Sequence, residues 1–163
     1  MRRFPVLLLA LVSIGFVVAQ AAPADVAPIV ADQGYFIEPG ADATDDVVGR
    51  AVSDARSAGS RFFAVVLAAE PASGATFYAD SILDRLPNQE GTVLVVAPST
   101  VGWAKNLDDT WSDDELNAAL DASLDGSTSN DVVTIFVGDL VGSPASSSGG
   151  GSGLWILIGI VLV

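Results

Sequence analysis

Apolar residues in the middle of the chain occur in two different patterns, a helical spacing and nearly continuous runs. Valine and alanine recur at helical spacing between Asp42 and Ala58, and a second apolar stripe at this spacing runs from Ala75 to Leu86. Between these segments Arg61 to Ala69 reads RFFAVVLAA, and Thr92 to Pro98 is a second run of strand-forming residues. Nearly continuous apolar runs are typical of strands that are covered on both faces. The pattern therefore predicts helices that alternate with buried strands.

Three further elements are expected after the second strand. A Ser-Thr pair at positions 99 and 100 suits a turn, so Val101 to Lys105 is expected to return as an antiparallel strand. Ser112 is followed three residues later by Glu115, which is a capping box and predicts the start of a helix. Asp131 to Val137 reads DVVTIFV, which we interpret as a last buried strand.

This order of elements defines the expected fold class. Strands that alternate with helices are joined by crossover connections, which favour parallel pairing. We expect an α/β fold, a small three-layer sandwich with a mostly parallel sheet of about four to five strands and helices on its faces. The segment from 22 to 142 would form this domain, and its length suffices for one hydrophobic core.

The amino-terminal segment has the pattern of an export signal. Arg2 and Arg3 precede an apolar run from Val6 to Ala19, and Ala19-Gln20-Ala21 supplies small residues for a cut. We interpret residues 1–21 as a signal peptide that is cleaved after Ala21; an uncleaved anchor has the same charge pattern and stays an alternative. In both cases the domain is expected on the extracytoplasmic side, because positive charge stays in the cytoplasm.

The carboxy-terminal segment has the pattern of a membrane tether. Residues 143–153 read SPASSSGGGSG, a flexible linker with a reach of roughly 15–20 Å. Leu154 to Val163 is apolar throughout, but as a helix it would rise only about 15 Å, half of a hydrocarbon core. We interpret it as the start of a transmembrane helix that continues beyond Val163; a short tail that packs on the domain is the alternative. A single-pass protein of the cell membrane is therefore expected.

Charge and composition exclude several classes of function. The chain has 20 acidic and seven basic residues, and since Arg2 and Arg3 belong to the export segment, the remainder carries a net charge of −15. Such a surface disfavours nucleic acid and anionic lipid as partners. The absence of histidine and cysteine excludes a Ser-His-Asp triad, a cysteine nucleophile and a conventional zinc site. Cations that prefer oxygen ligands, such as Ca²⁺ and Mg²⁺, stay possible.

One acidic cluster is a candidate site for such a cation. Asp108, Asp109 and Asp113 lie between the expected hairpin and the capped helix, close to Trp111. Their carboxylates could bind Ca²⁺ or Mg²⁺. The alternative is structural, because an aspartate in the first turn of a helix interacts favourably with the helix dipole, and adjacent aspartates suit a solvated turn. The spacing also matches no known calcium-binding loop.

Two tryptophans are candidates for contact with a partner protein. Trp103 lies in the expected hairpin and Trp111 directly precedes the capped helix. An exposed tryptophan is a strong anchor in protein interfaces. The alternative is that one packs under the hairpin and the other packs against the helix.

The order of parts resembles the TPM domain family, which comprises exported or membrane-tethered α/β modules. The likeness is carried by the helix before RFFAVVLAAE, by Tyr78-Ala79-Asp80 with Leu83, and by the segment from Asn88 to Ala97. Gln89-Glu90 stands where the family often has Asp-Asn before the glycine. The likeness covers roughly Val30 to Leu124 and is greatest for the single-domain, membrane-anchored members of actinobacteria.

The resemblance leaves two classes of function open. Family members serve as accessory subunits of membrane complexes, which implies an interaction or regulatory module acting on another cell-envelope protein, for example a cell-wall hydrolase or a membrane complex. Some plant members are acid phosphatases, which implies a metal-dependent phosphatase as the alternative. The residues favour the first class, because the sequence offers no catalytic constellation and this class needs no cofactor.

Overall fold

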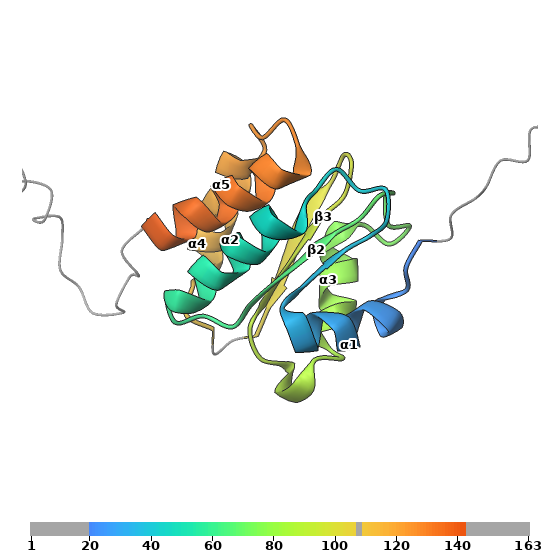
Figure 1. Cartoon of the computed structure of the whole chain (residues 1–163). Coiled ribbons are helices and arrows are strands. Elements are labelled where there is room, and N and C mark those ends of the chain that lie inside the picture. Colours follow the sequence, from blue (N-terminus) through green and yellow to red (C-terminus); the bar gives the residue numbers. More distant parts are fainter. Residues whose placement is uncertain (1–19, 107–108, 143–163) are drawn as a thin grey trace, which may run out of the picture.

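The structure of the chain is a computed structural model that describes residues 20–106 and 109–142 (Figure 1). Its elements, in chain order, are α1 (Pro23–Gln33), β1 (Tyr35–Ile37), α2 (Asp45–Ser57), β2 (Phe62–Val66), α3 (Ala75–Leu83), the 3-10 helix η1 (Pro87–Gln89), β3 (Thr92–Val96), β4 (Val101–Lys105), α4 (Asp113–Ser123) and α5 (Ser129–Gly142).

The strands form one four-stranded sheet in the order β1-β2-β3-β4. β1 pairs parallel to β2, and β2 pairs parallel to β3 with Phe62 opposite Thr92. β4 returns antiparallel to β3 with Val101 opposite Val96, so the expected hairpin is confirmed. The predicted α/β fold with a mostly parallel sheet is therefore confirmed.

Helices cover both faces of this sheet. Every residue of β2 and β3 is buried, and their side chains point alternately to two separate clusters. Phe62 and Leu94 belong to the cluster under α2, α4 and α5, whereas Phe63 and Val93 belong to the cluster under α1 and α3. Figure 1 shows the two helical layers on opposite sides of the strands. The apolar runs of the sequence are thus strands that are covered on both faces.

The two crossover connections have opposite hands. Both move the chain one strand further in the same direction across the sheet, from β1 to β2 and from β2 to β3. The first passes through α2 on one face and the second through α3 on the other face. Crossovers of one hand in one direction would place both helices on the same face, so one of these two is left-handed, against the strong preference for right-handed connections. As a consequence, α2 lies in the same layer as α5.

Residues 131–137 are helical, and their interpretation as a strand was wrong. They lie within α5, whose inward side chains Val133 and Phe136 are fully buried. A short apolar run has the same composition in a buried strand and in a buried helix, so its period could not decide between them. The pattern also did not predict α1 and β1, although Pro23 opens α1 and Gly34 ends it with a φ of 96°.

The start of α5 contains the signal that identifies it as a helix. Thr128 and Asp131 form a reciprocal pair in which the Asp131 N–H donates to the Thr128 hydroxyl and the Thr128 N–H donates to the Asp131 carboxylate, both at 3.1 Å. Hydrogen bonds from Ser127 and Thr128 lower the pKa of Asp131, so the carboxylate is ionised and accepts at neutral pH. Thr-x-x-Asp before an apolar run is a capping-box pattern.

Residues 1–19 of the expected signal peptide lie outside the described residues, as do the linker at 143–153 and the expected membrane segment. Gln20 and Ala21, the last two residues of the expected signal peptide, are described. Within the described ranges, every helix is too short or too polar to cross a bilayer.

We predict that Thr128→Ala lowers the free energy of unfolding by about 1 kcal/mol, because it removes the cap of α5. Chemical denaturation measures the change. Ser129→Ala is the matched control, since the Ser129 hydroxyl makes no hydrogen bond to the described part of the chain, and its effect should stay within about 0.5 kcal/mol. Equal effects of the two substitutions would contradict the assigned cap.

Candidate functional site

Asp109 connects the ends of two central strands to the loop after β4. Its carboxylate accepts hydrogen bonds from the hydroxyls of Ser60, at 2.8 Å, and of Thr92, and from the N–H of Thr110 at 2.7 Å. Ser60 and Thr92 are both buried. Because buried hydroxyls need partners, the observed role of Asp109 is structural.

Asp113 lies next to a positive charge. The ammonium of Lys105 is 3.0 Å from the Asp113 carboxylate and donates to the backbone carbonyl of Trp111 at 2.7 Å. Lys105 is the only lysine of the chain, and only 12% of its side chain is exposed. A cation at Asp113 would have to displace this lysine or be repelled by it.

The two described residues of the predicted metal site, Asp109 and Asp113, therefore do not form a metal-binding site together. Asp108 lies outside the described residues, and Asp109 and Asp113 are bound to other groups. Among residues 20–106 and 109–142, no three histidine, cysteine or acidic side chains come together in a way that could hold a metal ion. A site that depends on Asp108 stays a prediction.

The two tryptophans have different environments. Trp111 is only 2% exposed and packs edge-on against Phe62, with ring centroids 6.0 Å apart. Its side chain is part of the core and is not presented to a partner. Trp103 is half-buried and lines a shallow hollow beside β4, together with Asp80 of α3 and Leu120 of α4. Of the two candidate anchors, Trp103 is the accessible one.

A second hollow lies at the carboxyl ends of the parallel strands, the place where open α/β sheets commonly bind ligands. Asp42 and residues 127–129 line it. A nearby carboxylate, Glu38, is buried and accepts from the N–H groups of Ala21 and Ala68, at 2.7 and 2.8 Å. This carboxylate connects segments of the backbone, as Asp109 does at the opposite end of the strands.

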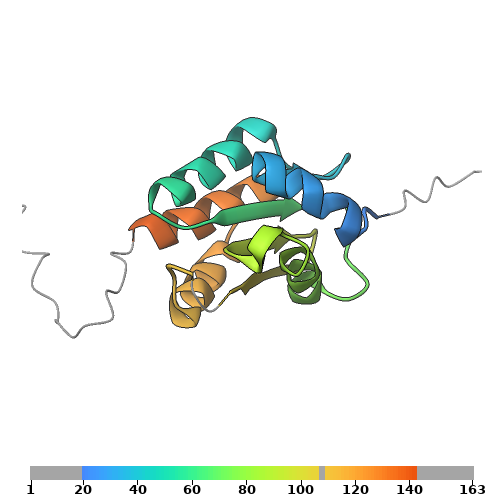
Figure 2. The same cartoon turned by 90° about the horizontal axis from the view of Figure 1, so that it is seen from below.

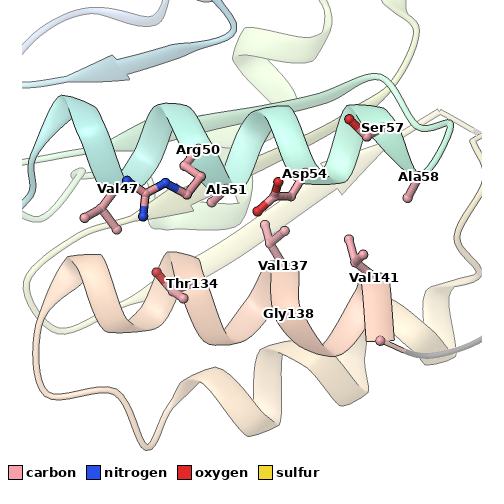
Figure 3. A pocket seen from close by; sticks show the side chains of 11 residues that line it. Val47, Arg50, Ala51, Asp54, Ser57, Ala58, Thr134, Val137, Gly138 and Val141 are labelled. Atoms are coloured by element: carbon pink, nitrogen blue, oxygen red, sulfur yellow. The ribbon is translucent and has the colours of Figure 1, made fainter.

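An apolar hollow lies between α2 and α5, and we call it the α2–α5 groove. It has a volume of about 640 Å³. Figures 1 and 2 both show the two helices side by side, and Figure 3 shows that they run in the same direction, with Val137 and Val141 of α5 pointing toward α2. The remaining lining residues are Val47, Arg50, Ala51, Asp54, Ser57, Ala58, Thr134, Gly138 and Gly142.

Small residues keep this groove open. A β-carbon added at Gly138 would meet no atom of the described residues beyond the adjacent backbone of α5 within 4 Å, so packing among these residues does not require glycine here. Glycine inside a helix is less stable than alanine by about 0.5–1 kcal/mol. Val141, one turn further along α5, is 42% exposed. The groove therefore presents an apolar surface that the domain does not cover.

One free positive charge lies on the rim of the groove. Of the five basic side chains in the described ranges, Arg50 is the one without a hydrogen bond or an ion pair to a described residue; the other four are Arg56, Arg61, Arg85 and Lys105. Figure 3 shows the Arg50 side chain extending along α2 toward Val47. The domain has a large excess of acidic residues, so a positive charge without an acidic partner beside an apolar groove differs from the rest of its surface.

The fold has a counterpart among solved structures. It resembles the solution NMR structure of the N-terminal domain of the cg2496 protein from Corynebacterium glutamicum, with a TM-score of 0.53 and 23% sequence identity, over 76% of this chain and 87% of that chain. This likeness shows the fold alone. No protein-family model matches the chain, and no curated protein matches it in sequence.

The sequence pattern did not predict the α2–α5 groove, because the interpretation of residues 131–137 as a strand leaves out the helix α5. The capping pattern at Thr128 would have identified the helix. A helical period would then have placed Thr134, Gly138 and Val141 on one face of it, three and four residues apart.

We predict that Asp109→Ala destabilises the domain by about 1–3 kcal/mol, because it leaves the buried hydroxyls of Ser60 and Thr92 without their acceptor. Chemical denaturation without divalent ions is the measurement. Asp121→Ala removes an exposed carboxylate of α4 and should change stability by less than about 0.5 kcal/mol. A stability loss for Asp109→Ala that appears only when Ca²⁺ or Mg²⁺ is added would contradict the structural role.

We also predict that Gly138→Ala raises the free energy of unfolding by about 0.5–1 kcal/mol, since it adds helix propensity and meets no other atom. The same substitution at Gly102 should destabilise the domain, because its new β-carbon would lie 2.4 Å from the backbone nitrogen of Thr76. Thermal and chemical unfolding measure both changes. Destabilisation by Gly138→Ala would show that the groove is filled at this position.

Proposed function

We propose that the chain is a membrane-anchored, extracytoplasmic interaction module whose α2–α5 groove binds an apolar helix of another cell-envelope protein. The observation that carries the proposal is the uncovered apolar groove, with its open floor at Gly138. A helix that packs into such a groove buries apolar surface, at about 25 cal/mol per Å². This role needs no cofactor.

The position of the tether supports a partner that lies close to the membrane. Gly142 lines the groove and is the last residue of α5, directly before the linker expected at 143–153. A linker with a reach of roughly 15–20 Å would keep the groove near the extracytoplasmic surface of the cell membrane. The segment of a membrane protein that adjoins its transmembrane helix is thus the occupant within reach.

Arg50 supports a partner helix with an acidic residue. The guanidinium lies on the rim of the groove and has no partner among the described residues. Once a partner helix covers it and removes water, an unpaired charge would be unfavourable, whereas a carboxylate can pair with it in a bidentate geometry. The partner segment we propose is therefore an apolar helix with an aspartate or glutamate near one edge.

We further infer a relation to the TPM domain family. The inference rests on the sequence resemblance from Val30 to Leu124, and the α/β fold of the domain is compatible with it. The accessory role of many family members supports the choice of an interaction module, on a protein such as a cell-wall hydrolase or a membrane complex.

Cross-linking in intact membranes, with mass spectrometry of the captured proteins, tests this proposal. We expect full-length protein to capture a specific membrane protein, and we expect Gly138→Leu and Arg50→Glu each to reduce capture at least about tenfold, equivalent to about 1.4 kcal/mol of binding. Asp139→Leu and Arg85→Glu are the controls: the first introduces a leucine at the neighbouring position of α5 outside the groove, and the second makes the same charge reversal as Arg50→Glu outside the groove. Both should retain capture.

The absence of any specific partner would contradict the proposed function. Unchanged capture by both groove variants would contradict the role of the groove. A loss of capture in both controls as large as the loss in the groove variants would contradict it as well. Circular dichroism of all four variants verifies that each one is folded.

A further inference from the structure

The first described residues are built into the domain. The Gln20 side chain donates to the backbone carbonyl of Ala69 at 3.2 Å. The N–H of Ala21 donates to the Glu38 carboxylate at 2.7 Å, and the carbonyl of Ala21 accepts from the Tyr78 hydroxyl at 2.6 Å. Both backbone groups of Ala21 are thus used by side chains that lie far away in the sequence.

The Glu38 carboxylate depends on the Ala21 contact. Glu38 is only 3% exposed, and no arginine or lysine in the described ranges forms an ion pair with it. Its two oxygens accept from the backbone N–H groups of Ala21 and Ala68. A buried carboxylate that loses one of its two protein donors loses stability, because the desolvation of the charge is then less well compensated.

The Tyr78 hydroxyl depends on the same residue. Tyr78 is 3% exposed, and burial, followed by the charges of Glu38 and Asp25, raises its pKa to about 12. The hydroxyl is therefore protonated throughout the physiological pH range and donates to the carbonyl of Ala21. Without Ala21, this buried donor would lose its acceptor.

We infer that the export segment is cleaved after Ala19, so that the mature protein begins at Gln20 and retains Ala21 as part of its fold. Hydrolysis of the Ala19–Gln20 peptide bond adds one water, leaving a carboxylate on Ala19 and an amine on Gln20. Ala19 supplies the small residue at the last position before the cut, and Val17 occupies the third-last position. The inference rests on the proposed export of the chain.

The neighbouring cuts fit the contacts less well. A cut after Ala21 has the better pattern of small residues, and the new amine of Ala22 could approach Glu38, but Tyr78 would still lose its acceptor. A cut before Ala21 would place Gln20, which is not small, at the last position before the cut. The cut after Ala19 leaves a small residue at the last position before the cut and retains the contacts of both buried side chains.

Mass spectrometry of the full chain, expressed in an actinobacterial host and recovered from its membranes, tests the inference. We expect an amino-terminal peptide that begins at Gln20, either free or cyclised with loss of ammonia from its side-chain amide. Two variants locate the cut independently of folding, because processing acts on the exported chain before it folds. Ala21→Leu should leave processing after Ala19 intact, whereas Ala19→Leu should block it.

An amino terminus at Ala22, or loss of processing in Ala21→Leu, would overturn the inference and leave the proposed function intact. An exported chain that keeps Met1 would do the same and would indicate the uncleaved anchor. A chain that is neither processed nor exported would contradict the proposed location itself.

Discussion

The structure depends on the burial of both faces of β2 and β3. No residue of either strand can face water, so each face needs its own layer of helices. Two successive crossovers supply these layers from opposite sides, and this requires one left-handed connection. Because α2 and α3 separate in this way, α2 becomes a neighbour of α5, and the imperfect packing between these two helices forms the groove. The candidate binding surface therefore follows directly from how the sheet is covered.

Several carboxylates in this domain are stabilised by hydrogen-bond donors other than lysine and arginine. Glu38, Asp109 and Asp131 accept hydrogen bonds from backbone N–H groups and hydroxyls. Glu70 does the same: burial alone would raise its pKa, but hydrogen bonds from Thr100 and Ser99 outweigh burial and lower it. A run of aspartates in such a sequence therefore has a structural explanation before a metal-binding one, and the described contacts of Asp109 and Asp113 agree with this.

The elements that could be predicted from the sequence are those whose apolar pattern or capping residues lie within the element itself. Continuous apolar runs identified β2 and β3, and the Ser112–Glu115 box identified α4. Residues 131–137 were misassigned because a short apolar run does not distinguish a buried helix from a buried strand. With α5 assigned correctly, the sequence would have indicated the face of α5 that lines the groove, but not that α2 lies opposite it, because the two helices are far apart in the sequence. The roles of Glu38 and Ala21 are equally non-local, since their partners come from distant segments.

The central claim is that the domain meets its partner through the α2–α5 groove. The most direct measurement places a photoreactive phenylalanine analogue at Val141, which lines the groove and is 42% exposed, or at Phe77, which is 68% exposed on α3 in the opposite helical layer, and irradiates intact cells. The account predicts a cross-link from position 141 to a membrane-associated protein and none to that protein from position 77. A cross-link to the same protein from position 77, with none from position 141, would contradict it.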